Sequence, residues 1–195
     1  MRAVLLILLW LSFTSFAPPA VQKLRYKIFK DKKEIGYISA IRTTQGETTT
    51  YDVETHMSIR VLINQKVEYT SKAIYQNGLL QNSIAKSFVN DKLHNTCITN
   101  WKGNHYTIKT DKNDHSLARS VAYSGAMLYF KEPPAGLIYS EMSGHDNTIR
   151  KAGIGHYILT NSKSKKQNKY WYKAGILDRA FLNHALIDIE IQRVS

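Results

Sequence analysis

Alternation between apolar and polar residues is the feature that most constrains how this chain can fold. The odd positions from Tyr51 to Ile59 are mostly apolar, whereas the even positions from Asp52 to Arg60 are all polar. Because successive side chains of a strand point to opposite faces, a period of two is typical of antiparallel strands that bury one face. The same period recurs over residues 24–28, 66–75 and 184–192.

Turn-forming residues separate these runs. Asn77-Gly78 lies between two apolar pairs and predicts a two-residue hairpin, because both residues tolerate positive φ. One short helix is predicted from Leu117 to Phe130, ahead of Pro133-Pro134. The fold class is therefore mainly β: a curved antiparallel sheet or open β-barrel of roughly ten strands with one short helix. Further turns are predicted at Lys33–Gly36, Gln45–Glu47, Asn90-Asp91, Lys102–Asn104 and Lys112–Asp114.

The N-terminus carries the marks of a secretory signal peptide. Arg2 precedes an apolar run from Ala3 to Phe16, and small residues follow between Ala17 and Ala20, where cleavage is expected. The run is short for a membrane span, and an uncleaved anchor is the alternative. We expect a signal peptide over residues 1–20, a single all-β domain over 21–195 with no membrane span, and export to the periplasm or exterior of a bacterium.

The chain is basic, with a formal net charge of +12 at pH 7. Such a charge attracts anionic partners, for example an envelope surface. Solubility is the alternative explanation, and scattering of the lysines along the chain favours it. The run from Lys163 to Lys169 beside Tyr170-Trp171-Tyr172 resembles a single-strand binding platform, but a lysine-rich hairpin loop is commoner. No nucleic-acid partner and no cofactor are expected, and the protein is expected to be a monomer.

The sequence gives little support for a reactive cysteine or a metal site. Cys97 is the only cysteine, and its neighbours Thr96 and Ile98 predict a small buried side chain. His184, Asp188 and Glu190 are of metal-binding types, but His184 and Asp188 would lie about 13 Å apart on a straight strand. Ligand bonds near about 2 Å exclude a shared ion at that separation. No metal site is predicted.

One segment concentrates the remaining candidate site residues. Glu132, Glu141 and His145 could perform general acid and base chemistry. Alternatively, the acids face water and the neighbouring aromatic residues fill the core. The sequence shows no pairing geometry among these groups, which favours the second interpretation. The same segment holds three aromatic candidates for contact with a ligand, Tyr129, Phe130 and Tyr139.

Two six-residue stretches echo each other. Tyr75 to Leu80 and Tyr172 to Leu177 share the pattern Tyr-x-x-Gly-apolar-Leu, which either a diverged duplication or convergent turn chemistry explains. Together with Leu128–Pro133 and Tyr139–Glu141, these stretches resemble an uncharacterised family of exported Bacteroidota proteins, catalogued as a domain of unknown function. That family is in turn similar to periplasmic antiparallel sheets such as the lipoprotein carriers. The resemblance implies a fold and a compartment, and it implies no catalytic residues.

Two functional hypotheses remain. The leading one is an exported, non-enzymatic β-sheet domain whose concave face accepts an apolar or lipid-like ligand, or which contacts an envelope partner. A packed core without a ligand is its plainer version. The alternative is a hydrolase or lyase that acts on envelope polysaccharide through Glu132 or Glu141 and His145, because a basic surface suits an acidic substrate. Carboxylates about 5–10 Å apart across an open cleft would favour the enzyme.

Overall fold

The computed structural model describes residues 18–60, 64–183 and 187–194, and within these ranges fourteen antiparallel strands form one continuous sheet. The strand order is β8-β7-β6-β5-β4-β3-β2-β1-β14-β13-β12-β11-β10-β9. The first eight strands are β1 (Ala20–Lys30), β2 (Lys33–Gln45), β3 (Thr48–Arg60), β4 (Asn64–Gln76), β5 (Leu79–Val89), β6 (Lys92–Trp101), β7 (Tyr106–Thr110) and β8 (Asp114–Leu117). The remaining six are β9 (Gly136–Ser140), β10 (His145–Gly153), β11 (His156–Thr160), β12 (Gln167–Lys173), β13 (Ile176–Asn183) and β14 (Asp188–Arg193).

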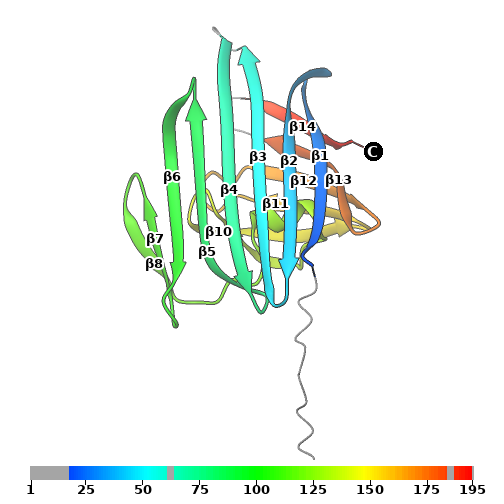
Figure 1. Ribbon diagram of the computed structural model, residues 1–195. Coiled ribbons are helices and arrows are strands. Elements are labelled where there is room, and N and C mark those ends of the chain that lie inside the picture. Colours follow the sequence, from blue (N-terminus) through cyan, green and yellow to red (C-terminus); the bar gives the residue numbers. More distant parts are fainter. Residues whose placement is uncertain (1–17, 61–63, 184–186, 195) are drawn as a thin grey trace, which may run out of the picture.

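The sheet curves back on itself without closing. The long strands β1 to β6 form one layer, and β10 to β13 pass behind them (Figure 1). A single 3-10 helix, η1 (Gly125–Tyr129), lies between the two layers and contacts β3, β4, β9 and β13. The edge strands β8 and β9 do not pair with each other. The expected mainly β, antiparallel, barrel-like fold is confirmed.

Burial follows the alternation in the sequence. On β3, Tyr51, Val53, Thr55 and Ile59 are buried, whereas the alternate residues from Asp52 to Ser58 keep access to solvent. On β14, Ile189 and Ile191 are buried in the same way. The inward side chains of both layers and of η1 form one core cluster. The side chains that the alternation marks as apolar on these strands therefore lie on the concave face of the sheet.

Two expectations about the elements are wrong. The sheet has fourteen strands rather than roughly ten. The helix expected over Leu117 to Phe130 is reduced to η1, because Leu117 ends β8 and residues 118–124 are not helical. Contacts with the sheet hold this stretch extended: Leu80 N donates to Val121 O at 2.9 Å, and Tyr139 N donates to Tyr123 O at 3.2 Å. Those tertiary bonds replace the ones that a helix would make.

The turn expected at Lys33–Gly36 is also misplaced. The chain reverses at Asp31-Lys32, where φ is 49° and 66°, and Lys33 already belongs to β2. Gly36 lies inside β2 opposite Met57, where a Cβ atom would collide with the backbone of β3. That glycine permits close approach of two strands, and the sequence alone does not distinguish this use from a turn.

The Asn77-Gly78 hairpin is confirmed. Asn77 and Gly78 have φ of 51° and 76°, and Gln76 pairs with Leu79 directly across the turn. The turns at Gly46-Glu47 and Asn90-Asp91 also lie where they were expected. Among the described residues, no helix has the length and apolar character needed to span a membrane.

Candidate functional site

Tyrosine hydroxyls attach the segment around η1 to the surrounding sheet. Tyr26 on β1 donates to Tyr129 O at 3.0 Å, and Tyr172 on β12 donates to Leu128 O at 2.9 Å. Tyr75 on β4 donates to Ser124 Oγ at 2.7 Å. These tyrosines come from both layers, so η1 is held from two sides of the concave face.

The echo noted in the sequence has a structural counterpart. Tyr75 and Tyr172 each follow a register shift in their strand and precede a two-residue turn with two positive φ values. Two residues beyond each turn, a buried leucine carbonyl accepts a tyrosine hydroxyl. Tyr106 donates to Leu80 O at 2.8 Å, and Tyr26 donates to Leu177 O at 3.3 Å. The two hairpins therefore have the same turn geometry and the same kind of hydrogen bond to a tyrosine, one in each layer.

Glu141 is the one buried acidic side chain in this region, with 2% of its surface exposed. Its Oε1 accepts a hydrogen bond from Ser124 Oγ at 2.5 Å and another from Ala126 N at 3.0 Å. Burial raises the pKa of Glu141, and the hydrogen bonds from Ser124 and Ala126 act against that rise. At Gly125, a Cβ atom would lie 2.9 Å from Glu141 Oε2, so glycine leaves room for the carboxyl group.

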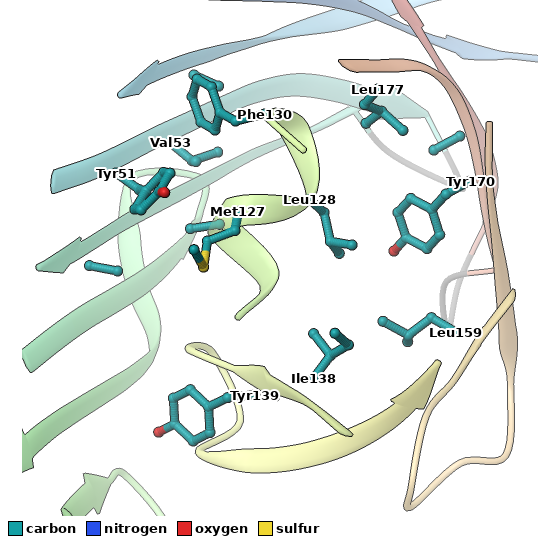
Figure 2. Close-up of a cluster of buried hydrophobic side chains, with 14 of the residues drawn as sticks. Tyr51, Val53, Met127, Leu128, Phe130, Ile138, Tyr139, Leu159, Tyr170 and Leu177 are labelled. Carbon is teal, nitrogen blue, oxygen red and sulfur yellow. The ribbon is translucent and has the colours of Figure 1, made fainter. Parts of the chain in front are cut away.

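A cavity of about 260 Å³ adjoins η1 and Glu141. Figure 2 shows Leu128, Ile138, Leu159 and Tyr170 facing one another from different elements, and all four line this cavity. The lining runs from fully buried residues such as Val53 to partly exposed ones such as Asn161. The concave face is thus mostly filled by the segment around η1, and part of it remains hollow.

Polar side chains occupy one part of the cavity wall, where Tyr69, Ser71, Tyr129 and Glu141 all contribute. Burial raises the pKa of both tyrosines, and the nearby Glu141 carboxyl adds to that rise. Ser71 Oγ is buried and has no hydrogen-bond partner in the described part of the chain. This serine was missed in the sequence, although it interrupts the apolar face of β4 between Tyr69 and Ala73.

The structure places the three candidate catalytic residues in different settings. Glu141 hydrogen-bonds to the segment before η1, and Glu132 Oε2 accepts from the hydroxyl of Tyr157 at 2.7 Å. The ring of His145 stacks on that of His115, with 4.5 Å between the centroids. Within the described ranges, no hydrogen bond or ion pair joins any two of the three. Each of the three therefore has its own partners, and a catalytic role for them stays a prediction.

Two of the three aromatic candidates reach the cavity. Tyr129 and Tyr139 line it, and the Tyr139 hydroxyl lies 2.5 Å from Thr99 Oγ1. Phe130 is buried and packs against Tyr51, with 5.5 Å between the ring centroids, but it does not line the cavity. Contact of Tyr129, Phe130 and Tyr139 with a ligand stays a prediction.

Side chains bridge the gap between the two edges of the sheet. His115 on β8 donates from Nε2 to Gly144 O at 3.0 Å, next to the stack with His145. Arg119 contacts Asp146 through two hydrogen bonds, one of them from Nε to Oδ2 at 2.9 Å. We call these contacts of His115, Arg119, Gly144, His145 and Asp146 the seam. The seam joins β8 and the residues after it to β10 without backbone pairing.

The remaining sequence features have structural roles. Cys97 is fully buried, and burial raises the pKa of its thiol to about 11, as expected for an inert side chain. Trp171 lies outside the core and stacks on His156, at 4.8 Å between centroids, and beneath the guanidinium of Arg179, at 4.6 Å. This indole ring therefore already has two partners, His156 and Arg179. His184, one of the rejected metal ligands, lies outside the described residues.

Comparison with known proteins assigns a family. A family model described as a domain of unknown function, DUF6134, matches residues 26–194. The chain belongs to this family. The expected resemblance to a domain of unknown function is thus confirmed, whereas a Bacteroidota origin and a likeness to lipoprotein carriers stay predictions.

A solved structure shares the fold of this DUF6134 protein. It is the beta-barrel-like protein of domain of unknown function DUF1849 from Brucella abortus, with a TM-score of 0.53 and 10% sequence identity. The match covers 89% of this chain and 96% of that chain. At this identity the likeness concerns the fold alone. No curated protein matches the chain.

Proposed function

We propose that this protein is an exported, non-enzymatic binding domain whose interior cavity holds a small, mainly apolar ligand. The observation that carries the proposal is the cavity of about 260 Å³ beneath the curved sheet, walled by aliphatic and tyrosine side chains together with polar ones from serine, asparagine and Glu141. Ligand sites are typically concave, mostly apolar and equipped with a few polar groups. The cavity beside η1 is concave and combines an apolar part, which includes Leu128, Ile138 and Leu159, with a larger set of polar groups than is typical.

The size of the cavity limits the ligand. Its volume of about 260 Å³ lies below the range of about 300–1,000 Å³ that is usual for drug-sized ligands. A compact molecule, or one end of a longer chain, fits this space better than a complete phospholipid. We therefore propose a ligand smaller than a complete lipid, in place of the lipid-like ligand expected from the sequence.

The contacts of the acidic candidates support a binding role over a catalytic one. Glu141 accepts hydrogen bonds that fix the start of η1, and Glu132 accepts one from Tyr157. General acid and base catalysis requires groups placed together around one reacting atom. The separate hydrogen-bond partners of Glu132 and Glu141, and the stacking of His145 on His115, support structural roles for these three residues.

Mass spectrometry of the purified protein tests the binding role. Organic extraction of protein purified from the exported fraction should release a small apolar molecule. Ala180 is a fully buried residue of the cavity wall. The variant Ala180→Leu should fill the cavity with a larger side chain and displace that molecule. The control Ala152→Leu makes the same change at an exposed position of β10. Extracts without any such molecule, together with no uptake of added apolar probes, would contradict the proposal.

Export is tested separately. The mature chain should lack 17 to 20 residues when its intact mass is measured in the soluble periplasmic or secreted fraction. Strand β1 begins at Ala20, so cleavage after Ala17 would leave this strand whole. Recovery of the full-length mass from that fraction would contradict cleavage.

A further inference from the structure

The charges around the cavity differ sharply from those of the whole molecule. The chain has a net charge of +12, yet none of the described residues that line the cavity is a lysine, arginine or histidine. Glu141 is the one carboxyl group in the lining. An anion buried there would find no cationic partner, and burial of an unpaired charge is strongly unfavourable. Fatty acids and other carboxylates therefore fit this cavity poorly.

Ser71 shows where a ligand would be recognised. Only 4% of its surface is exposed, it lines the cavity, and its Oγ has no hydrogen-bond partner within the described ranges. A buried hydroxyl without a partner costs free energy that a suitable ligand atom would recover. Tyr129 lines the same cavity, and its hydroxyl makes no hydrogen bond to the described residues either. Ser71 and Tyr129 thus add polar groups to the asparagine side chains of the wall, Asn147, Asn161 and Asn168.

Glu141 extends this polar wall. Its Oε1 is occupied by Ser124 and Ala126, so the carboxyl group is held in place by the protein itself. Burial raises its pKa, which favours the neutral acid, a group that both donates and accepts. The Glu141 carboxyl group lines the same cavity as Ser71 and Tyr129. A hydroxyl or an amide suits it in either protonation state, because each of these groups both donates and accepts.

We propose that the cavity selects an uncharged ligand that carries a hydroxyl or amide group on a small apolar body. The polar group would meet Ser71 and Glu141, and the apolar body would pack against Ile138, Leu159 and Leu177. This inference rests on the proposed binding function and names the chemical class of its ligand. It excludes the fatty acids that a lipid-carrier fold would suggest.

A matched series of five compounds, each a benzene ring with one substituent, tests the selection. Binding of benzyl alcohol, benzamide, benzoate, benzylammonium and toluene to the mature chain would be measured by saturation-transfer NMR and calorimetry at pH 8. Benzyl alcohol and benzamide should bind at least tenfold more tightly than benzoate. Benzoate that binds as tightly as benzyl alcohol would overturn the inference. Benzylammonium that binds more tightly than the alcohol, and loses that advantage in Glu141→Gln, would overturn it as well.

Two serine variants test the recognition residue. Ser71→Ala should weaken benzyl alcohol binding several-fold and leave toluene binding unchanged. Ser83→Ala is the matched control, because Ser83 on β5 is equally buried, also lacks a hydrogen-bond partner in the described part, and does not line the cavity. Melting curves of both variants check the fold. Equal alcohol affinities in the wild type and a folded Ser71→Ala would overturn the inference.

The experiment separates two kinds of failure. Binding of toluene and the alcohol with equal affinity would retain the proposed function and overturn the polar selection. Failure of all five compounds to bind the folded wild-type chain would overturn the proposed function. It would also overturn the inference about the chemical class of the ligand.

Discussion

Glu141 illustrates how a single buried acid can serve structure. Its carboxyl group fixes Ser124 and Ala126 at the start of η1, and Tyr75 extends the chain of hydrogen bonds to β4. Removing such a group would leave buried donors without a partner, at a cost of about 1–3 kcal/mol each. Glutamine at this position keeps one acceptor oxygen, replaces the other oxygen by an NH2 group and cannot ionise.

The variant Glu141→Gln should reveal this ionisation in the pH dependence of stability. Burial raises the pKa of Glu141 above its value in the unfolded chain. A raised pKa contributes stability that is fully present below the unfolded value of 4.5 and is lost as pH rises through the folded value. The unfolding free energy of the wild type should therefore fall relative to that of Glu141→Gln as pH rises.

Urea titrations of the two proteins between pH 4 and pH 8 measure the effect. Each unit of pKa displacement corresponds to about 1.4 kcal/mol. A constant difference between wild type and Glu141→Gln over this range would show that the carboxyl group is not perturbed. Glu54→Gln, at an exposed position of β3, is the control and should leave the pH dependence unchanged.

At the scale of elements, the hairpins depend on residues with positive φ. Gly78 has φ of 76° and no neighbouring atom near a hypothetical Cβ, so Gly78→Ala introduces backbone strain without a clash. The substitution should lower the unfolding free energy by about 1 kcal/mol, because alanine disfavours the left-handed region. Gly153→Ala, at a glycine without positive φ, should change stability by less than about 0.5 kcal/mol. Equal denaturation midpoints for Gly78→Ala and the wild type would contradict this turn assignment.

The tyrosines that hold η1 provide a second prediction for elements. Tyr172→Phe removes the donor to Leu128 O and leaves a buried carbonyl without that bond, so it should destabilise the protein by about 1–2 kcal/mol. Tyr51→Phe changes an equally buried ring whose hydroxyl makes no hydrogen bond within the described ranges, and should be nearly neutral. Denaturant unfolding compares the two. A smaller loss for Tyr172→Phe than for Tyr51→Phe would contradict the role of this hydroxyl.

Local patterns in the sequence predicted the strands better than the helix. Alternation over Tyr51 to Ile59 is a property of neighbouring residues, and it survives in the burial of β3. The stretch from Leu117 to Phe130 is fixed instead by distant groups, among them Leu80 N and the Tyr172 hydroxyl. Single-sequence periodicity contains no information on such contacts, so tertiary hydrogen bonds overrode a loose helical pattern.

The same limit applies to the candidate site. Tyr129, Tyr139 and Glu141 were named from one aromatic-rich segment, and all three line the cavity. Ser71 and Tyr69 come from β4, far away in the sequence, and become neighbours of Glu141 only when the sheet curves. A polar residue on an apolar strand face, as at Ser71, is the signal that could have identified this wall.

At the scale of the whole molecule, side-chain contacts join the two ends of the sheet that backbone hydrogen bonds leave unpaired. Strands β8 and β9 are unpaired with each other, and the seam brings β8 against β10 through His115, Arg119, His145 and Asp146. A closed barrel would have continuous backbone hydrogen bonds at this place. A junction made from ionisable side chains instead can respond to pH, because its stability depends on their charges.

Acidification should therefore loosen the seam. Burial lowers the pKa of His145, Lys163 and His115 lower it further, and Asp146 acts against them. The other charged group at the seam, Arg119, is paired with Asp146. A histidine with a lowered folded pKa contributes stability above its unfolded value of 6.5, and this stability is lost as pH falls through the folded value. Hydrogen exchange of β8, corrected for intrinsic rates, should accelerate between pH 7 and pH 5.

His145→Gln tests whether this histidine is the cause. The variant lacks the titrating ring, so the protection of β8 should change less between pH 7 and pH 5 than it does in the wild type. His94→Gln, at an exposed position of β6, is the control and should retain the wild-type response. The same pH response in His145→Gln and in the wild type would assign the effect to another group. Because β8 is an edge strand held by side chains, its exchange reports opening of the seam before the central strands unfold.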